Sequence, residues 1–214
     1  MLRRNLLYIK IDKYEGFMDT GGGTTFKFRE GELKMKFIEA KELDFLPKKV
    51  IVFIGNDYWR NRIYLFDYIR KRFGFINTVP KLPSYKMYNK KMNYAHFKIE
   101  LEEKEEMFLF DTGATLTKDK KNSAISFLDG EVFDKLKNKY KIINNYDDDG
   151  SPCMTISIVI FNTIIKAGFL RRKKGAFTSF MKKQTGIEHI GAIGGNILRH
   201  FKIIADYKNK LFYV

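Results

Sequence analysis

The chain has 214 residues, of which 44% are hydrophobic, 15% aromatic and 30% charged. This composition supports an apolar core in one medium domain or two small lobes, and it excludes disorder as the default state. The formal net charge of +15 is compatible with nucleic acid, an anionic membrane or acidic substrates, but no nucleic-acid motif accompanies it, so a solvated lysine-rich surface is the favoured explanation and nucleic acid is not an expected partner.

The first half of the chain has the patterns of a series of strands. Apolar runs and apolar–polar alternation predict strands, in chain order, at 6–11, 16–18, 26–29, 33–37 and 50–54. The third and fourth of these are joined by Glu30-Gly31-Glu32, which predicts a short hairpin. Residues 78–91 contain two prolines and no clear period, which is typical of a linker.

The second half repeats the order of the first. Strands are predicted at 97–101, 107–110, 154–161 and 163–170, and helical spacing predicts one short helix at 131–140. Asp147 to Gly150 give a turn signal, and Arg171 to Gly175 form a basic loop.

Several side chains are better explained by structure than by chemistry. Cys153 is the only cysteine, so it cannot form an internal disulfide and is expected to be structural. The three histidines have no metal spacing, and the acidic run at 147–149 is better explained as a solvated loop than as a cation site, so we expect no metal and no cofactor. No apolar run reaches membrane-spanning length and none at the N-terminus suits a signal peptide, so the sequence as given predicts a cytoplasmic protein, with a longer precursor left open.

The two halves share an internal repeat. Residues 54–68, from Ile54-Gly55 to Asp67-Tyr68, align without a gap with residues 193–207, from Ile193-Gly194 to Asp206-Tyr207. Upstream of each copy lies an Asp-Thr-Gly sequence preceded by apolar residues, at 19–21 and at 111–113. One such tripeptide is weak by itself, but two copies with the same downstream element indicate a duplicated functional unit.

These motifs resemble a known family of enzymes. Asp111-Thr112-Gly113-Ala114-Thr115 resembles the catalytic loop of retropepsin-like and pepsin-like aspartic peptidases, and Ile193 to Leu198 resembles the family's second signature, which threads behind that loop. The resemblance covers most of residues 92–214 and, more loosely, residues 5–77. It implies a mostly β acid-protease fold of two unequal β lobes with one or two short helices: an N-terminal half-site lobe at 1–77, a linker at 78–91, and a retropepsin-like lobe with a flap at 92–214.

The resemblance implies an aspartic endopeptidase in which a water is activated between the carboxylates of Asp19 and Asp111. Two carboxylates at close range cannot both ionise cheaply, so the pair retains one proton and can act as general acid and general base. In the family, the threonines bond across to the opposite loop and the glycines permit close approach of the two loops. The supporting residues so implied are Thr20, Gly21, Thr112, Gly113 and Ala114.

The residue three positions after each aspartate affects the pH at which the enzyme is expected to be active. Pepsins often have a serine there, whose hydroxyl stabilises an ionised carboxylate, whereas this chain has Gly22 and Ala114. Without that donor the pair is expected to hold its proton to higher pH, giving a mildly acidic to neutral activity optimum.

A peptidase of this class needs a hairpin flap that covers the substrate. The stretch between Asp111 and Gly194 is long enough for a helix and a flap, whereas that between Asp19 and Gly55 is short. The flap is therefore predicted in the second lobe. Its substrate-binding residues would be Tyr146, Asp149, Gly150 and Ser151.

Three functions stay open at this point. The leading one is a monomeric endopeptidase acting on an extended protein or peptide substrate, with Asp19 completing the dyad. A variant uses Asp111 alone and forms the dyad by homodimerisation. The third is a catalytically decayed module whose basic surface binds a partner. Asp19 discriminates among them, because its glycine-rich surroundings depart from the family pattern.

Overall fold

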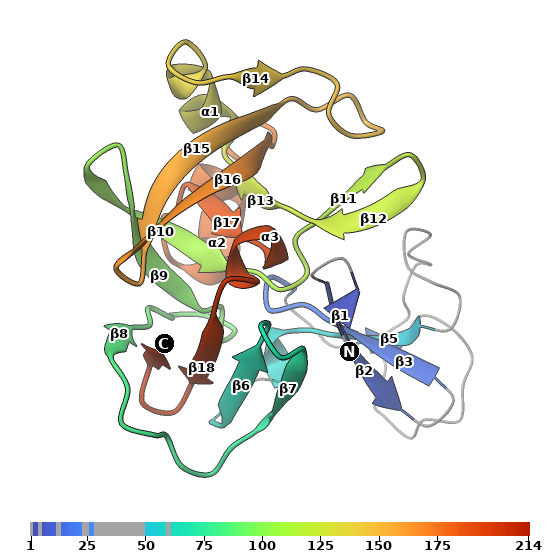
Figure 1. Cartoon of the computed structure of the whole chain (residues 1–214), viewed down its shortest axis with the longest axis vertical. Coiled ribbons are helices and arrows are strands. Elements are labelled where there is room, and N and C mark those ends of the chain that lie inside the picture. The colour runs from blue at the N-terminus through green and yellow to red at the C-terminus, as the bar shows by residue number, and fades with distance from the viewer. Residues whose placement is uncertain (1, 4–5, 12–13, 23–25, 28–49, 59–60) are drawn as a thin grey trace.

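The computed structural model describes residues 2–3, 6–11, 14–22, 26–27, 50–58 and 61–214. Most of the regular structure in these residues is β, as Figure 1 shows. The α-helices are short: α1 (Gly130–Leu136), α2 (Lys182–Thr185) and α3 (Gly195–Leu198), accompanied by a 3-10 turn at Asn56–Tyr58 and a π segment at Ala176–Met181. The predicted fold class, mostly β with two unequal β lobes and few short helices, is confirmed, although one or two helices were expected.

The first half of the chain forms a five-stranded sheet in the order β1-β2-β3-β5-β4. Its strands are β1 (Leu2–Arg3), β2 (Leu6–Ile11), β3 (Tyr14–Met18), β4 (Phe26–Lys27) and β5 (Val50–Ile54). β3 and β5 run parallel, with Met18 beside Ile54. The strands predicted at 6–11 and 50–54 are confirmed, whereas most of the predicted hairpin lies outside the described residues.

The second half forms a seven-stranded sheet in the order β14-β15-β16-β13-β17-β10-β9, and β15 also pairs with β9. Its strands are β9 (His96–Leu101), β10 (Lys104–Phe110), β13 (Ser126–Leu128), β14 (Ile142–Ile143), β15 (Cys153–Ile160), β16 (Thr163–Arg171) and β17 (Gly191–Ile193). A separate hairpin of β11 (Thr115–Lys118) and β12 (Lys121–Ala124) was not predicted. β10 and β17 run parallel, with Phe110 beside Ile193, which is the arrangement of β3 and β5 in the first half.

A third sheet joins the two halves in the order β7-β6-β18-β19-β8, in the lower part of Figure 1. Its strands are β6 (Ile63–Asp67), β7 (Arg72–Phe75), β8 (Ser84–Lys86), β18 (Lys202–Asp206) and β19 (Leu211–Tyr213). β6 and β18 are the ends of the two repeat copies, and they pair antiparallel with Leu65 opposite Ile204. β8 lies inside the segment predicted to be a linker, so that segment contributes a strand.

Aromatic side chains fill the space between this joining sheet and the second half. The ring of Phe110 lies 5.3 Å from that of Phe66 and 5.3 Å from that of Phe212, and all three residues are buried. Because Phe110 immediately precedes Asp111, this cluster fixes the start of the second Asp-Thr-Gly loop. Within the described residues, no helix combines the length and the hydrophobicity that crossing a membrane would need.

Candidate active site

Each Asp-Thr-Gly loop begins where one strand of a parallel pair ends. Asp19 follows β3, and its backbone N–H donates to the carbonyl of Ile54 on β5 at 2.9 Å. Asp111 follows β10, and its N–H donates to the carbonyl of Ile193 on β17 at 3.1 Å. Ile54 and Ile193 are matched positions of the sequence repeat, so the repeat places the two aspartates in equivalent backbone environments.

The two carboxyl groups face each other. They are hydrogen-bonded to one another, and each also accepts a backbone N–H from its own loop, Gly21 to Asp19 Oδ1 at 2.7 Å and Gly113 to Asp111 Oδ1 at 3.0 Å. A Cβ added to Gly21 would lie 2.3 Å from Asp111 Cγ, and one added to Gly113 would lie 2.3 Å from Asp19 Cγ. Each glycine therefore gives the opposite carboxyl its space, because any side chain there would overlap it.

The two threonines tie the loops together. Thr20 Oγ1 donates to the carbonyl of Phe110 at 2.7 Å and accepts the N–H of Thr112 at 2.9 Å. Thr112 Oγ1 donates to the carbonyl of Met18 at 2.9 Å and accepts the N–H of Thr20 at 3.1 Å. Both threonines are fully buried, so these four bonds are made away from water. Such bonds resist separation of the loops, because breaking them would leave buried polar groups unpaired.

Burial is the main influence on the acidity of the pair. Burial raises the pKa of Asp19 well above its ordinary value, and the charge of Asp111 and the hydrogen bond to it raise it further. Burial also raises the pKa of Asp111, but its hydrogen bond with Asp19 and the N–H groups of its own loop counteract that effect. The pair consequently holds a proton at a pH where an isolated carboxyl group would have lost it.

Three polar side chains behind the loops were not anticipated. Asn56, fully buried, donates through Nδ2 to the carbonyls of Thr20 and of Gly22, the latter at 2.9 Å. In the second half, Ser126 Oγ accepts the N–H of Gly194 at 3.0 Å and donates to Asn196 Oδ1 at 2.7 Å. Asn56 and Asn196 both lie just after the Ile-Gly motifs of the repeat. A polar residue at this place in both copies was the sequence signal that could have identified them as supports of the loops.

The predicted flap residues lie together between β14 and β15. The N–H of Tyr146 donates to the carbonyl of Ser151 at 2.8 Å, and Gly150 takes a positive φ of 76° at the turn. The carboxylate of Asp148 accepts two N–H groups of the β11–β12 turn, from Asp119 at 2.8 Å and Lys120 at 3.0 Å. The unpredicted hairpin thus braces this loop, whose role as a flap stays a prediction.

The cysteine, histidine and aspartate side chains considered next lie outside the dyad, and their contacts are those of structural residues. Cys153 is buried, and burial raises the pKa of its thiol to about 11. His96 and His189 are buried with their rings 4.7 Å apart, and the described residues contain no group of three or more His, Cys, Asp or Glu that could hold a metal ion. Asp67 and Asp206 each accept a backbone N–H three residues ahead at 2.9 Å, as expected of turn residues.

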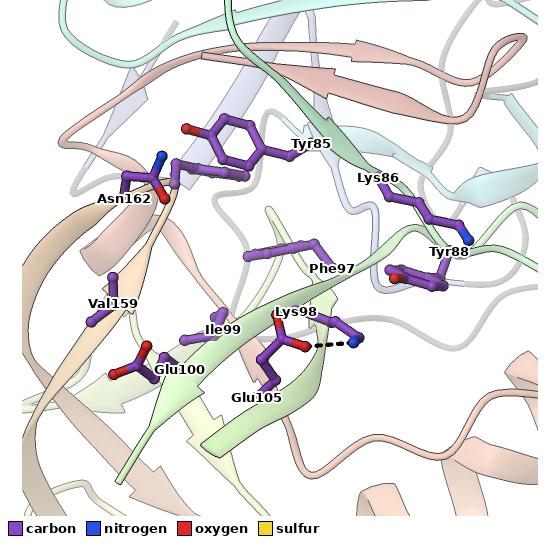
Figure 2. A pocket seen from close by; sticks show the side chains of 11 residues that line it. Tyr85, Lys86, Tyr88, Phe97, Lys98, Ile99, Glu100, Glu105, Val159 and Asn162 are labelled. Atoms are coloured by element: carbon purple, nitrogen blue, oxygen red, sulfur yellow. Dashed lines mark hydrogen bonds and ion pairs between the residues drawn. The ribbon is translucent and has the colours of Figure 1, made fainter. Parts of the chain in front are cut away.

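A surface pocket of about 270 Å³ lies away from the dyad, between β8, β9 and the hairpin of β15 and β16. Figure 2 shows its lining, in which Lys98 and Glu105 form an ion pair at 2.6 Å. Neither aspartate of the dyad lines it.

Comparison with known proteins gives a distant likeness among solved structures. No protein-family model and no curated protein matches the chain. Among solved structures, a retropepsin-like aspartic protease from Rickettsia conorii is similar over 64% of this chain and 94% of that chain, with 17% sequence identity and a TM-score of 0.40.

Proposed function

We propose that the chain is an aspartic endopeptidase that hydrolyses peptide bonds with a water activated between Asp19 and Asp111. The observation that carries the proposal is the direct contact of two half-buried carboxyl groups, one from each half of the chain, with a glycine opposite each. A structural turn would need no such pairing, because bringing two half-buried carboxyl groups together is costly.

The chemistry follows from one proton shared by two carboxyl groups. The ionised member takes a proton from the water as general base while the water attacks the peptide carbonyl carbon. The protonated member donates to the carbonyl oxygen as general acid. The carboxyl group that took the water's proton then gives it to the amide nitrogen, and a hydroxyl of the tetrahedral intermediate returns its proton to the other carboxylate. The C–N bond breaks, releasing the amine and the new carboxyl terminus. No covalent bond to the enzyme forms, and the dyad returns with its proton restored to one of the two groups.

The surrounding bonds favour this reaction by fixing the carboxyl groups before substrate binds. The N–H groups of Gly21 and Gly113 orient one oxygen of each carboxyl, and the crossed threonine bonds hold the loops at one separation. Prearranged groups of this kind need little rearrangement at the transition state. The substrate would be a protein or peptide in extended conformation under the loop at Tyr146 to Ser151.

The geometry favours a single-chain site over the two alternatives. Asp19 occupies the position that a second copy would have to supply in a homodimer, and it carries the same loop contacts as Asp111. A decayed binding module would have no reason to keep the glycines and threonines of both loops. We therefore propose an active monomer.

The test is cleavage of a mixed peptide library by the wild type and by Asp19→Asn and Asp111→Asn, read by mass spectrometry. Each substitution should lower the rate by about a hundredfold to ten-thousandfold, because each removes a general acid or base. Glu103→Gln, which removes a carboxylate from the exposed β9–β10 turn, is the matched control and should cleave normally.

Two results would contradict the proposal. If both Asn variants cleave like the control, the dyad is not the catalytic centre. If activity per chain falls on dilution as a dimer dissociates in sedimentation, the homodimeric alternative replaces the monomer.

A further inference from the structure

The basic loop after β16 contains two exposed cations, Arg172 and Lys173, that form no ion pair within the part of the chain that the structure describes. Arg171 binds Asp134 through two bonds, Nε to Oδ1 at 3.0 Å and Nη2 to Oδ2 at 2.9 Å, and Lys174 Nζ lies 3.9 Å from the same carboxylate. Arg172 lies between them in the sequence, is exposed, and forms no ion pair with a carboxylate in the described residues. Its charge is therefore available to a ligand.

Arg172 is nevertheless held in place. Its N–H donates to the carbonyl of Leu128 at 2.9 Å, and its guanidinium carbon lies 4.6 Å from the centre of the Phe127 ring. The carbonyl of Arg172 fits closely against Gly130, where a Cβ would approach to 2.7 Å. An arginine stacked on a buried aromatic ring keeps its planar donors in one orientation, which lowers the entropy lost on binding a carboxylate.

The fold places this guanidinium beside the strands of the dyad. Phe127 lies on β13, paired with Ala192 on β17, and β17 pairs with β10, the strand that Asp111 follows. Phe127 also shares a buried cluster with Ala114 of the catalytic loop. Burial raises the pKa of Asp111, whereas the positive charge of Arg172 lowers it. The guanidinium therefore lies near enough to influence the charge of the dyad.

We propose that Arg172 is a specificity residue that binds an acidic side chain of the substrate close to the scissile bond. The enzyme would then select peptides with Glu or Asp at one subsite. A planar guanidinium forms paired hydrogen bonds with a carboxylate. Arg172 would therefore be one of the basic residues behind the net charge of +15 that has a specific binding role. This inference rests on the proposed peptidase activity.

The experiment compares matched peptides that carry Glu, Gln or Lys at each position around the cleaved bond. The wild type should prefer Glu over Gln at one position by about tenfold to a hundredfold in kcat/KM, as expected for a hydrogen-bonded charged pair. Arg172→Glu should lose that preference and favour Lys at the same position. Lys173→Glu makes the same charge change at the exposed neighbouring residue and should keep the preference for Glu.

The pH dependence of the preference gives a second readout. A peptide Glu takes up its proton below about pH 4.3, whereas an arginine keeps its charge. The wild-type preference for Glu over Gln should therefore shrink below that pH, and a preference that persisted there would show that shape rather than charge is selected.

The outcomes separate the inference from the proposed function. If the wild type cleaves, Asp111→Asn does not, and Arg172→Glu has the wild-type preference, the inference is wrong and the peptidase assignment stands. If Lys173→Glu reverses the preference as strongly as Arg172→Glu, the general charge of the loop is responsible and the assignment to Arg172 is wrong. If Asp111→Asn cleaves like the wild type, the proposed function falls, and this inference falls with it.

Discussion

Thr20→Val tests whether the crossed threonine bonds hold the two halves of the site together. Valine has nearly the shape of threonine but no hydroxyl. The change would remove the bond to the Phe110 carbonyl at 2.7 Å and the bond from the Thr112 N–H at 2.9 Å. The reverse pair, made by the hydroxyl of Thr112, would remain.

The expected loss of stability follows from the burial of these groups. Thr20 is fully buried, so the Phe110 carbonyl and the Thr112 N–H would be left without water or a new partner. An unpaired buried group costs about 1–3 kcal/mol, which gives about 2–6 kcal/mol for the two. At about 2–4 °C for each kcal/mol in a chain of this size, Tm should fall by at least several degrees.

Activity should fall as well, because the loops carry the two carboxyl groups. A displacement of about 1 Å at a catalytic group costs about a hundredfold in rate, so kcat should drop by that order. The assay measures unfolding and kcat side by side for Thr20→Val and for Thr20→Ser, which keeps the hydroxyl and deletes a methyl group. Should the two variants have the same Tm and kcat, the crossed bonds would contribute nothing and the reasoning would be refuted.

Three further outcomes are expected. Gly113→Ala should abolish activity in a folded protein, since its Cβ would lie 2.3 Å from Asp19 Cγ; full activity would contradict the close packing of the loops. Asp19→Asn should raise Tm at pH 7 and lose that advantage below about pH 4. Burial raises the pKa of the Asp19 carboxyl group in the folded state, so the folded protein retains a proton that the unfolded chain releases as pH rises, and the wild type loses stability. An equal gain in Tm at both pH values would exclude this cause. Arg172→Gln should move the acidic limb of the pH–rate profile to higher pH, because a cation that lowers the pKa of Asp111 is lost; Lys173→Gln should leave the limb in place, and the same movement in both would show a general charge effect.

The sequence was informative where one local pattern determines the backbone. The repeat aligned Ile54 with Ile193, and these are the residues whose carbonyls accept the N–H groups of Asp19 and Asp111. Strands with strong apolar patterns, such as 6–11 and 50–54, were placed at the residues where the structure has them. In these segments local propensity and burial favour the same conformation, so sequence alone could identify them.

Elsewhere the conformation depends on distant partners. The β11–β12 hairpin is polar and has only Leu116 and Ala124 as buried apolar residues, so it lacks a clear strand period. β8 is exposed at both ends and forms by pairing with β19, which lies far along the chain. The π segment is held by the carboxylate of Asp129, which accepts the N–H of Phe177 at 2.9 Å. None of these contacts has a signal within a local window of sequence.

The two half-sites have the same backbone arrangement but different polar side chains around their aspartates. The carbonyls of the first loop are bound by Asn56, whereas the second half uses Ser126 and Asn196 on the strand and helix behind the loop. Burial raises the pKa of both Asp19 and Asp111, and the positive charge of Arg172 counteracts that rise at Asp111. The proton that remains therefore belongs to the pair as a whole. A duplicated unit becomes asymmetric in this way without any change in its Asp-Thr-Gly loops, because the residues behind and beside the two loops differ.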